Sequence, residues 1–167
     1  LAVYGEFKDM TPDMPTLTYN RIGRHISRIV RTRIVSATSP WAMHPSVIDE
    51  RNHLIAISHG EGRFVVDPVL AEQMFKNGQV FTQYVDEFGR PAITEPDNPN
   101  GSAYAIEGIT SPDGHVLGKM GHSERGVGMQ ANGSSFELFK NVGGNPITNE
   151  NETTCENLFA AGVSYFK

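Results

Sequence analysis

A strong turn signal between two apolar segments is the feature that most constrains the fold of this chain. Residues 103–110 and 115–120 flank the tetrapeptide Ser111-Pro112-Asp113-Gly114. Proline presets φ for a turn and glycine accepts positive φ, so the tetrapeptide favours a tight reversal over a continued strand. We therefore predict a β-hairpin, and the fold must contain a sheet that includes both of its strands.

Further local signals predict the elements around this hairpin. β-Branched residues dominate 24–36, and apolar runs at 54–57, 65–66 and 79–86 also indicate strands. Asp67 followed by a proline is typical of a helix start, so a short helix is expected before Gly78.

A closing helix is predicted after the capping-box sequence Thr153-Thr154-Cys155-Glu156. Its apolar face is expected to dock on a sheet, and consists of Leu158, Phe159, Gly162, Val163 and Phe166. Strands that alternate with helices, together with a hairpin, indicate an α/β layered domain with a mixed sheet.

Length and charge limit the classes of protein that fit. The 167 residues suit a single domain, 1–167, and the net charge of −5 argues against non-specific nucleic-acid binding. Neither a membrane-spanning apolar stretch nor a signal peptide is recognisable, so we expect a cytoplasmic protein without a membrane partner. The single cysteine, Cys155, excludes an internal disulfide framework.

His122 and Glu124 are the first candidate for chemistry, because they directly follow the second hairpin strand. Residues two apart point to the same face if the backbone is extended, so the carboxylate could orient the imidazole. Such a pair forms two members of a nucleophile, base and orienter triad. We predict the two side chains in contact at a strand end; the alternative is a surface pair without a catalytic role.

The second candidate is the stretch His59-Gly60-Glu61-Gly62-Arg63. Its glycines allow a ligand to approach the backbone closely, and its charged groups suit the recognition of a charged ligand. The alternative is a bulged turn with solvated charges.

Both candidates belong to longer blocks that resemble the glutaminase domain of phosphoribosylformylglycinamidine synthases, in its C-terminal portion. The resemblance covers most of the chain, and residues 126–150 are its least diagnostic part. The blocks that carry it are Asn20 to Val35, Ser39-Pro40-Trp41, Ser58 to Phe64, Asn98-Pro99-Asn100-Gly101-Ser102 and Ile109 to Arg125.

The resemblance implies a three-layer α/β/α class I glutamine amidotransferase-like domain with a mixed sheet, incomplete at its N-terminus. It implies a Cys-His-Glu triad in which His122 is the base and Glu124 its orienter. By the same resemblance, His59, Gly60 and Glu61 lie near bound glutamine. The nucleophilic cysteine is expected upstream of this chain, since Cys155 lacks the glycine-flanked turn of the family, and the isolated chain is expected to be inactive.

The resemblance also implies partners and cofactors. The partners are upstream synthase domains and the N-terminal half of the glutaminase domain, and the substrate is glutamine. ATP and magnesium are implied for the synthase domains, whereas no cofactor is expected in this chain.

Two other classes of function remain open from the residues. A metal-dependent hydrolase would use zinc-type ligands, here His44, His53, His59, Glu61, His122 and Glu124. A phosphate- or RNA-binding module would use a basic stripe, here Arg21, Arg24, Arg28, Arg31 and Arg33.

Overall fold

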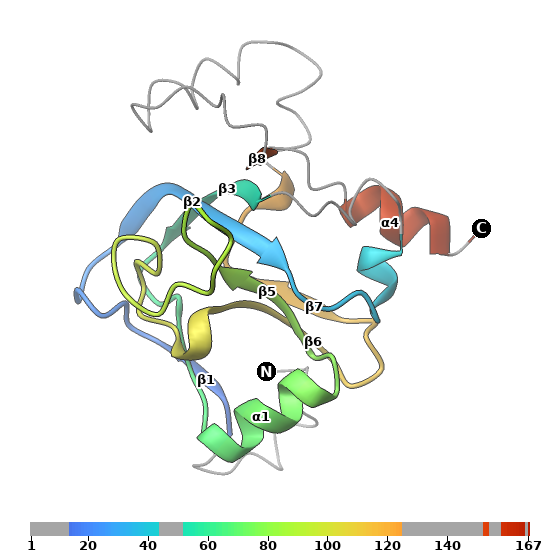
Figure 1. Ribbon diagram of the computed structural model, residues 1–167, viewed down its shortest axis with the longest axis horizontal. Coiled ribbons are helices and arrows are strands. Elements are labelled where there is room, and N and C mark those ends of the chain that lie inside the picture. The colour runs from blue at the N-terminus through green and yellow to red at the C-terminus, as the bar shows by residue number, and fades with distance from the viewer. Residues whose placement is uncertain (1–13, 44–51, 125–151, 154–157, 166) are drawn as a thin grey trace.

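A mixed six-stranded sheet forms the body of the computed structural model, which describes residues 14–43, 52–124, 152–153, 158–165 and 167 (Figure 1). Its strands are β2 (Ile26–Ile34), β3 (Asn52–His59), β5 (Val80–Tyr84), β6 (Ile106–Thr110), β7 (Leu117–Lys119) and β8 (Glu152–Thr153). They are arranged in the order β7-β6-β5-β2-β3-β8. Neighbours are antiparallel except β3 and β8, which are parallel. The predicted α/β class with a mixed sheet is confirmed.

The longest ladder of this sheet joins β2 and β3. It runs from the pair Ile26–His59 to the pair Thr32–His53. The β-branched residues that predicted a strand at 24–36 fill β2, because their side chains pack well on a pleated surface. The other edge of β2 pairs with β5 through Thr32 and Ile34.

The predicted hairpin is formed by β6 and β7, with Thr110 opposite Leu117. Gly114 has a φ of 76°, the left-handed conformation that the turn signal demands. The Gly114 carbonyl accepts a hydrogen bond from Ser39 Oγ at 2.7 Å, which anchors the turn to a distant segment.

The first hairpin strand is shorter than predicted, because a 3₁₀ turn, η4 (Ala103–Ala105), takes up its beginning. Tyr104 and Ala105 have φ values of 53° and 58°. Left-handed backbone cannot continue an extended ladder. Gln83 Nε2 donates to the Tyr104 carbonyl at 2.7 Å and holds this turn against β5.

The predicted short helix is α1 (Pro68–Lys76). The Asp67 carboxylate accepts hydrogen bonds from the amides of Val69 at 2.8 Å and Leu70 at 3.3 Å. The proline and the acidic cap therefore act as the sequence predicted. The helix ends before Gly78, whose φ is 70°.

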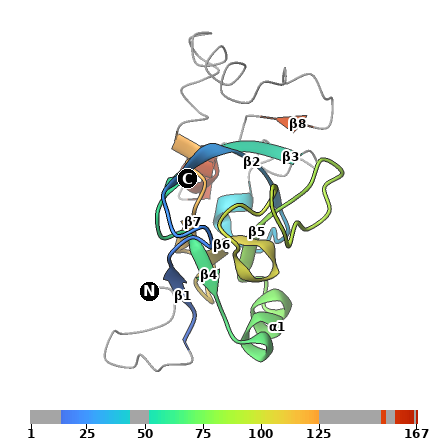
Figure 2. The same cartoon turned by 90° about the vertical axis from the view of Figure 1, so that its left-hand side faces the viewer.

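A small two-stranded sheet lies beside α1. It pairs β1 (Thr16–Thr18) with β4 (Arg63–Val65) in antiparallel register (Figure 2). The predicted strand pieces on either side of the glycine-rich bend are thus β3 and β4, and they belong to different sheets.

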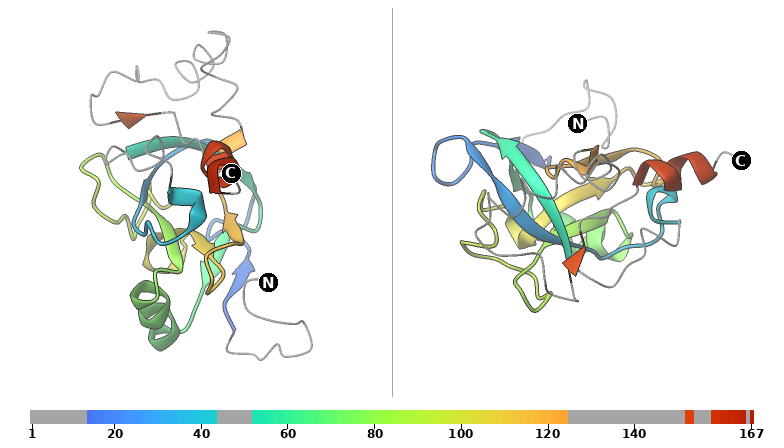
Figure 3. Two further views of the ribbon diagram at one scale, coloured as in Figure 1. Left: turned by 90° about the vertical axis from the view of Figure 1, so that its right-hand side faces the viewer. Right: turned by 90° about the horizontal axis from the view of Figure 1, so that it is seen from above.

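The closing helix, α4 (Leu158–Tyr165), corrects our prediction of its apolar face. Leu158 and Ala161 are buried, whereas Phe159 and Val163 are 52% and 58% exposed. The helix packs against a short 3₁₀ turn, η3 (Pro40–Ala42), and its buried Leu158 also packs with Phe81 of the sheet, so the predicted docking on a sheet is confirmed in part (Figure 3).

The small residues explain the difference at α4. A side chain at Gly162 would place its Cβ 3.0 Å from the Trp41 ring, so the helix approaches η3 through its small positions. The expected cap residue Thr153 lies in β8. Residues 154–157 and Phe166 lie outside the described residues.

The core surrounds β5, which is buried at every position. Phe81 packs with Leu158 of α4, Val80 packs with Met74 of α1, and Tyr84 belongs to the cluster that includes residues of β2 and β3. Each partner of β5 thus supplies part of the core. Within the described residues we find no helix with the length and apolar character of a membrane span.

Asp67→Ala is expected to lower the free energy of unfolding by ~1 kcal/mol, because it removes the acceptor for two helix-start amides. Chemical denaturation measures the loss. Gln73→Ala, an exposed change in the same helix, serves as the control and should stay within ~0.5 kcal/mol of the parent chain. Equal losses in the two variants would contradict the capping role.

Candidate functional site

His122 and Glu124 are in contact at the end of the hairpin, as predicted. His122 Nδ1 lies 2.6 Å from Glu124 Oε1. Ser123 and Glu124 have helical rather than extended backbone, so a turn of the chain brings the side chains together instead of a shared strand face. Both side chains retain access to solvent, with exposed fractions of 31% and 57%. We call this pair the dyad.

The backbone of the dyad rests against β3. The His122 amide donates to the Ala56 carbonyl at 2.9 Å, and Gly121 forms an isolated antiparallel bridge with Ile57. Residue 121 has no space for a side chain, because a Cβ there would lie 2.3 Å from Ile55 Cγ2. The close approach of the two backbones fixes where His122 stands.

The second candidate, the stretch from His59 to Arg63, begins at the end of β3 and is held by Asn20. The Asn20 side chain is buried, and its Nδ2 donates to the carbonyls of His59 at 2.8 Å and Arg24 at 2.9 Å. Its Oδ1 accepts from the Gly62 amide at 3.1 Å and lies 3.0 Å from His59 Nδ1. One amide side chain therefore joins both ends of the loop.

These contacts define the tautomer of the His59 ring. An amide oxygen can only accept, so the proton of neutral His59 is on Nδ1, which leaves Nε2 as an acceptor. Nε2 is buried and has no hydrogen-bond partner among the described residues. Burial lowers the pKa of His59, and positive charge on His25 and His122 lowers this pKa further.

The two glycines of the loop have different surroundings. A Cβ at Gly62 would lie 2.2 to 2.5 Å from three atoms of the His59 ring, whereas nothing lies within 4 Å of a Cβ at Gly60. Glu61, between them, is exposed. The imidazole thus occupies the space of a side chain at 62, and the backbone at 60 remains accessible.

Buried polar side chains at 100 and 102 hold the stretch from His59 to Arg63 in place. Asn100 Nδ2 donates to the Gly62 carbonyl at 2.7 Å and to the Tyr84 hydroxyl at 2.8 Å. Ser102 Oγ donates to the same carbonyl at 3.3 Å and accepts from the Phe64 amide at 3.1 Å. The sequence did not reveal this supporting role, since the contacts involve residues far apart in the chain.

The structure brings the two predicted candidates together at one end of β3. His122 binds the carbonyl of Ala56, and His59 is the last residue of the same strand.

The geometry gives little support to the two alternative functions, a metal-dependent hydrolase and a phosphate- or RNA-binding module. No group of three or more potential metal ligands gathers among the described residues, and His44 lies outside them. His53 is buried inside the sheet. In the basic stripe, Arg31 faces Asp97 at 3.8 Å, so part of its charge is offset within the molecule.

Comparison with known proteins decides the family. Residues 2–166 match the family model described as the CobB/CobQ-like glutamine amidotransferase domain. This chain belongs to that family. The resemblance of its sequence blocks to a glutamine amidotransferase domain is confirmed.

Several relatives carry the name phosphoribosylformylglycinamidine synthase. Subunit PurQ of Halobacterium salinarum is 36% identical over 108 residues, which cover 65% of this chain and 46% of the relative. Subunit PurQ of Treponema denticola is 31% identical over 156 residues, covering 90% and 52%. The synthase of Saccharomyces cerevisiae is 42% identical over 80 residues, covering 47% and 6%. The chain therefore spans about half the length of the PurQ relatives and a small part of the yeast protein.

A solved structure supports the fold of the amidotransferase domain. The structure of PurLQS from Thermotoga maritima matches with a TM-score of 0.58 and 24% identity, over 92% of this chain and 54% of that chain. At this identity the match shows a shared fold.

Gly62→Ala is expected to destabilise the fold by ~1–3 kcal/mol, because the new methyl group must displace the His59 ring from Asn20. Gly60→Ala, two residues away, meets open space and should cost far less. Urea denaturation of both variants measures the difference. A Gly62→Ala variant as stable as Gly60→Ala would show that the ring does not fill this space.

The lowered pKa of His59 predicts a pH-dependent contribution to stability. Folding favours the neutral ring, so its contribution is complete above the ordinary pKa of about 6.5 and declines as the pH falls from there toward the folded pKa. The difference in unfolding free energy between the parent chain and His59→Gln should shrink between pH 7.5 and 5. A constant difference over that range would contradict the assignment.

Proposed function

We propose that this chain is part of a glutaminase that releases ammonia from glutamine for a phosphoribosylformylglycinamidine synthase. The observation that carries the proposal is the 2.6 Å contact between His122 Nδ1 and Glu124 Oε1 in a member of a glutamine amidotransferase family. Relatives are named phosphoribosylformylglycinamidine synthase. The reaction that we propose the ammonia serves converts formylglycinamide ribonucleotide to its amidine.

The chemistry of the dyad follows from its geometry. Glu124 holds Nδ1, so Nε2 of His122 is the ring nitrogen available for proton transfer. A cysteine thiolate attacks the amide carbon of glutamine, and the protonated His122 gives its proton to the departing nitrogen. The departure of ammonia produces a glutamyl thioester. His122 then takes a proton from the water that hydrolyses this thioester and passes it to the departing cysteine sulfur. Glutamate and the free thiol are the remaining products.

The source of the thiol is not among the described residues, and Cys155 lies outside them. The PurQ relatives are about twice as long as the segment that matches this chain. In this proposal the nucleophile belongs to a part of the protein other than these 167 residues.

His59, Gly60 and Glu61 are proposed to bind the substrate glutamine. The open side of Gly60 admits close approach to the backbone. Glu61 is exposed and can pair with an ammonium group. The bond of the His122 amide to β3 and the position of His59 at the end of the same strand support a single site that includes both.

The ammonia is proposed to pass to synthase domains that bind ATP and magnesium and act as the partners of this chain. A relative is named as subunit PurQ of that synthase, and the matching solved structure is that of PurLQS from Thermotoga maritima. This chain itself is proposed to need no cofactor, because amide hydrolysis by a thiolate and an imidazole uses protein groups alone.

His122→Ala in the full-length protein that carries this chain should abolish amidine formation from glutamine and leave formation from ammonium salts intact. The reason is that the dyad serves only the release of ammonia. Amidine formation is measured with each nitrogen source in turn. Equal loss with both sources in a folded variant would sink the proposal.

Glu124→Ala should also affect only the glutamine-dependent reaction, with a smaller loss than His122→Ala. An imidazole without its orienting carboxylate still acts as a base part of the time. The same paired assay tests this order, and a larger loss in Glu124→Ala would contradict the assigned roles.

A further inference from the structure

Glu107 is a buried carboxylate that the proposed reaction does not use. It lies on β6, and its side chain has no exposed surface. A carboxylate is rarely tolerated in such a position unless it is hydrogen-bonded and paired with a positive charge. The groups that its two oxygens contact therefore indicate its role.

The first oxygen, Oε1, accepts a hydrogen bond from the backbone amide of Gly121, the residue before His122. A Cβ at Gly121 would lie 2.9 Å from this oxygen and 2.3 Å from Ile55 Cγ2. The backbone that carries His122 is thus held between Glu107 and β3.

The second oxygen, Oε2, accepts from the Thr82 hydroxyl and lies 3.8 Å from Lys119 Nζ. Thr82 reaches it because the neighbouring residue is Gly108, where a Cβ would lie 2.4 Å from Thr82 Oγ1. Lys119 Nζ also donates to Ser123 Oγ at 3.2 Å. Ser123 is the residue between the two members of the dyad, so the network reaches the chain on both sides of His122.

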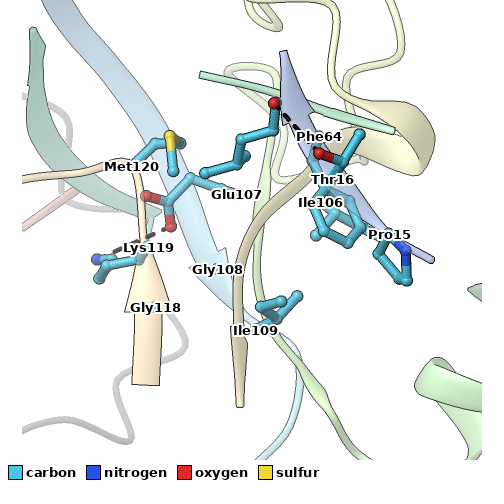
Figure 4. Close-up of a pocket in the computed structure, with 11 residues that line it drawn as sticks. Pro15, Thr16, Phe64, Ile106, Glu107, Gly108, Ile109, Gly118, Lys119 and Met120 are labelled. Carbon is cyan, nitrogen blue, oxygen red and sulfur yellow. Dashed lines mark hydrogen bonds and ion pairs between the residues drawn. The ribbon is translucent and has the colours of Figure 1, made fainter. Parts of the chain in front are cut away.

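The surroundings of this network are poorly solvated. Figure 4 shows Glu107 and Lys119 side by side on the wall of a cavity of about 480 Å³, with apolar residues such as Ile106, Ile109 and Met120 around them. The Lys119 side chain is only 9% exposed. Hydrogen bonds to charged groups are stronger in such an environment than in water.

We propose that Glu107 is a positioning residue that fixes the backbone beneath His122, with Lys119 as its counter-charge and as a second tether through Ser123. This inference rests on the proposed function, because the position of His122 matters for catalysis only if the dyad releases ammonia from glutamine. A buried ion pair is weak evidence for stability, since apolar residues of similar volume often replace such pairs without loss. Its attachment to the residues on either side of His122 is what indicates a role in the site.

Two double variants of the full-length protein isolate this role. Glu107→Met with Lys119→Met removes both charges together and the acceptor for the Gly121 amide. Glu107→Gln with Lys119→Met also removes both charges, yet retains an oxygen that can accept from Gly121. Neither leaves an unpaired buried charge, so the comparison isolates the acceptor. Val80→Ala, a core change in contact with Met74, controls for general destabilisation.

The variant with Glu107→Met and Lys119→Met should lose ~10–100-fold in kcat with glutamine, the range expected when a catalytic group is misplaced by about 1 Å. KM for glutamine and the rate with ammonium salts should stay unchanged. The variant with Glu107→Gln and Lys119→Met should recover the part of the loss that is due to the acceptor for Gly121. Val80→Ala should keep the parent kcat at a temperature where it is folded.

His122→Ala in the same assay separates the inference from the function on which it rests. If His122→Ala spares the glutamine-dependent reaction, the proposed function fails. If His122→Ala abolishes it while the two double variants have equal kcat values, Glu107 is not a positioning residue. If the variant with Glu107→Met and Lys119→Met does not fold, Ser123→Ala is the test. An unchanged kcat in Ser123→Ala overturns the tether through Lys119.

Discussion

The antiparallel ladder between β2 and β3 is the constraint on which the rest of the structure depends. On one side of it, β2 pairs with β5 and brings the hairpin β6–β7 into the sheet. On the other side, the Ala56 carbonyl receives the amide of His122, and His59 ends the same strand. A slip of this ladder by one residue would turn every side chain of β3 to the opposite face and separate the two parts of the candidate site.

Polar contacts between distant segments, rather than apolar packing alone, set the shape of the site. Asn20, Asn100 and Glu107 are buried, and each one bonds to backbone groups of a loop that carries a candidate residue. A buried amide or carboxylate is costly when its partners are missing, so each contact specifies one arrangement of the loop. Sheet and loops together thus define the position of the dyad.

The elements with local signals could be predicted from the sequence. The turn at Gly114, the cap at Asp67 and the β-branched run in β2 each depend on residues adjacent in the chain. The contact of His122 with Glu124 was also predictable from spacing, although helical backbone rather than a strand face produces it. The resemblance to a glutaminase domain identified the family, which composition and periodicity alone could not do.

The features that the sequence did not reveal depend on tertiary contacts. The predicted apolar face of α4 was wrong at Phe159 and Val163, which are exposed because the helix packs on η3 through its small residues. Glu107 shows no pattern in the sequence that separates it from a surface glutamate. Its role emerges only when Gly121, Thr82 and Lys119, from three different parts of the chain, are seen around its carboxylate.

The glycine next to Glu107 has a consequence for how sequences of this family can diverge. The Thr82 hydroxyl occupies the space that a Cβ at Gly108 would need. A larger residue at 108 is compatible with the sheet only if 82 becomes smaller, and the carboxylate at 107 then loses a donor. These positions are therefore not free to drift independently, and a lineage that replaces Gly108 has to rebuild the support beneath its histidine at the same time.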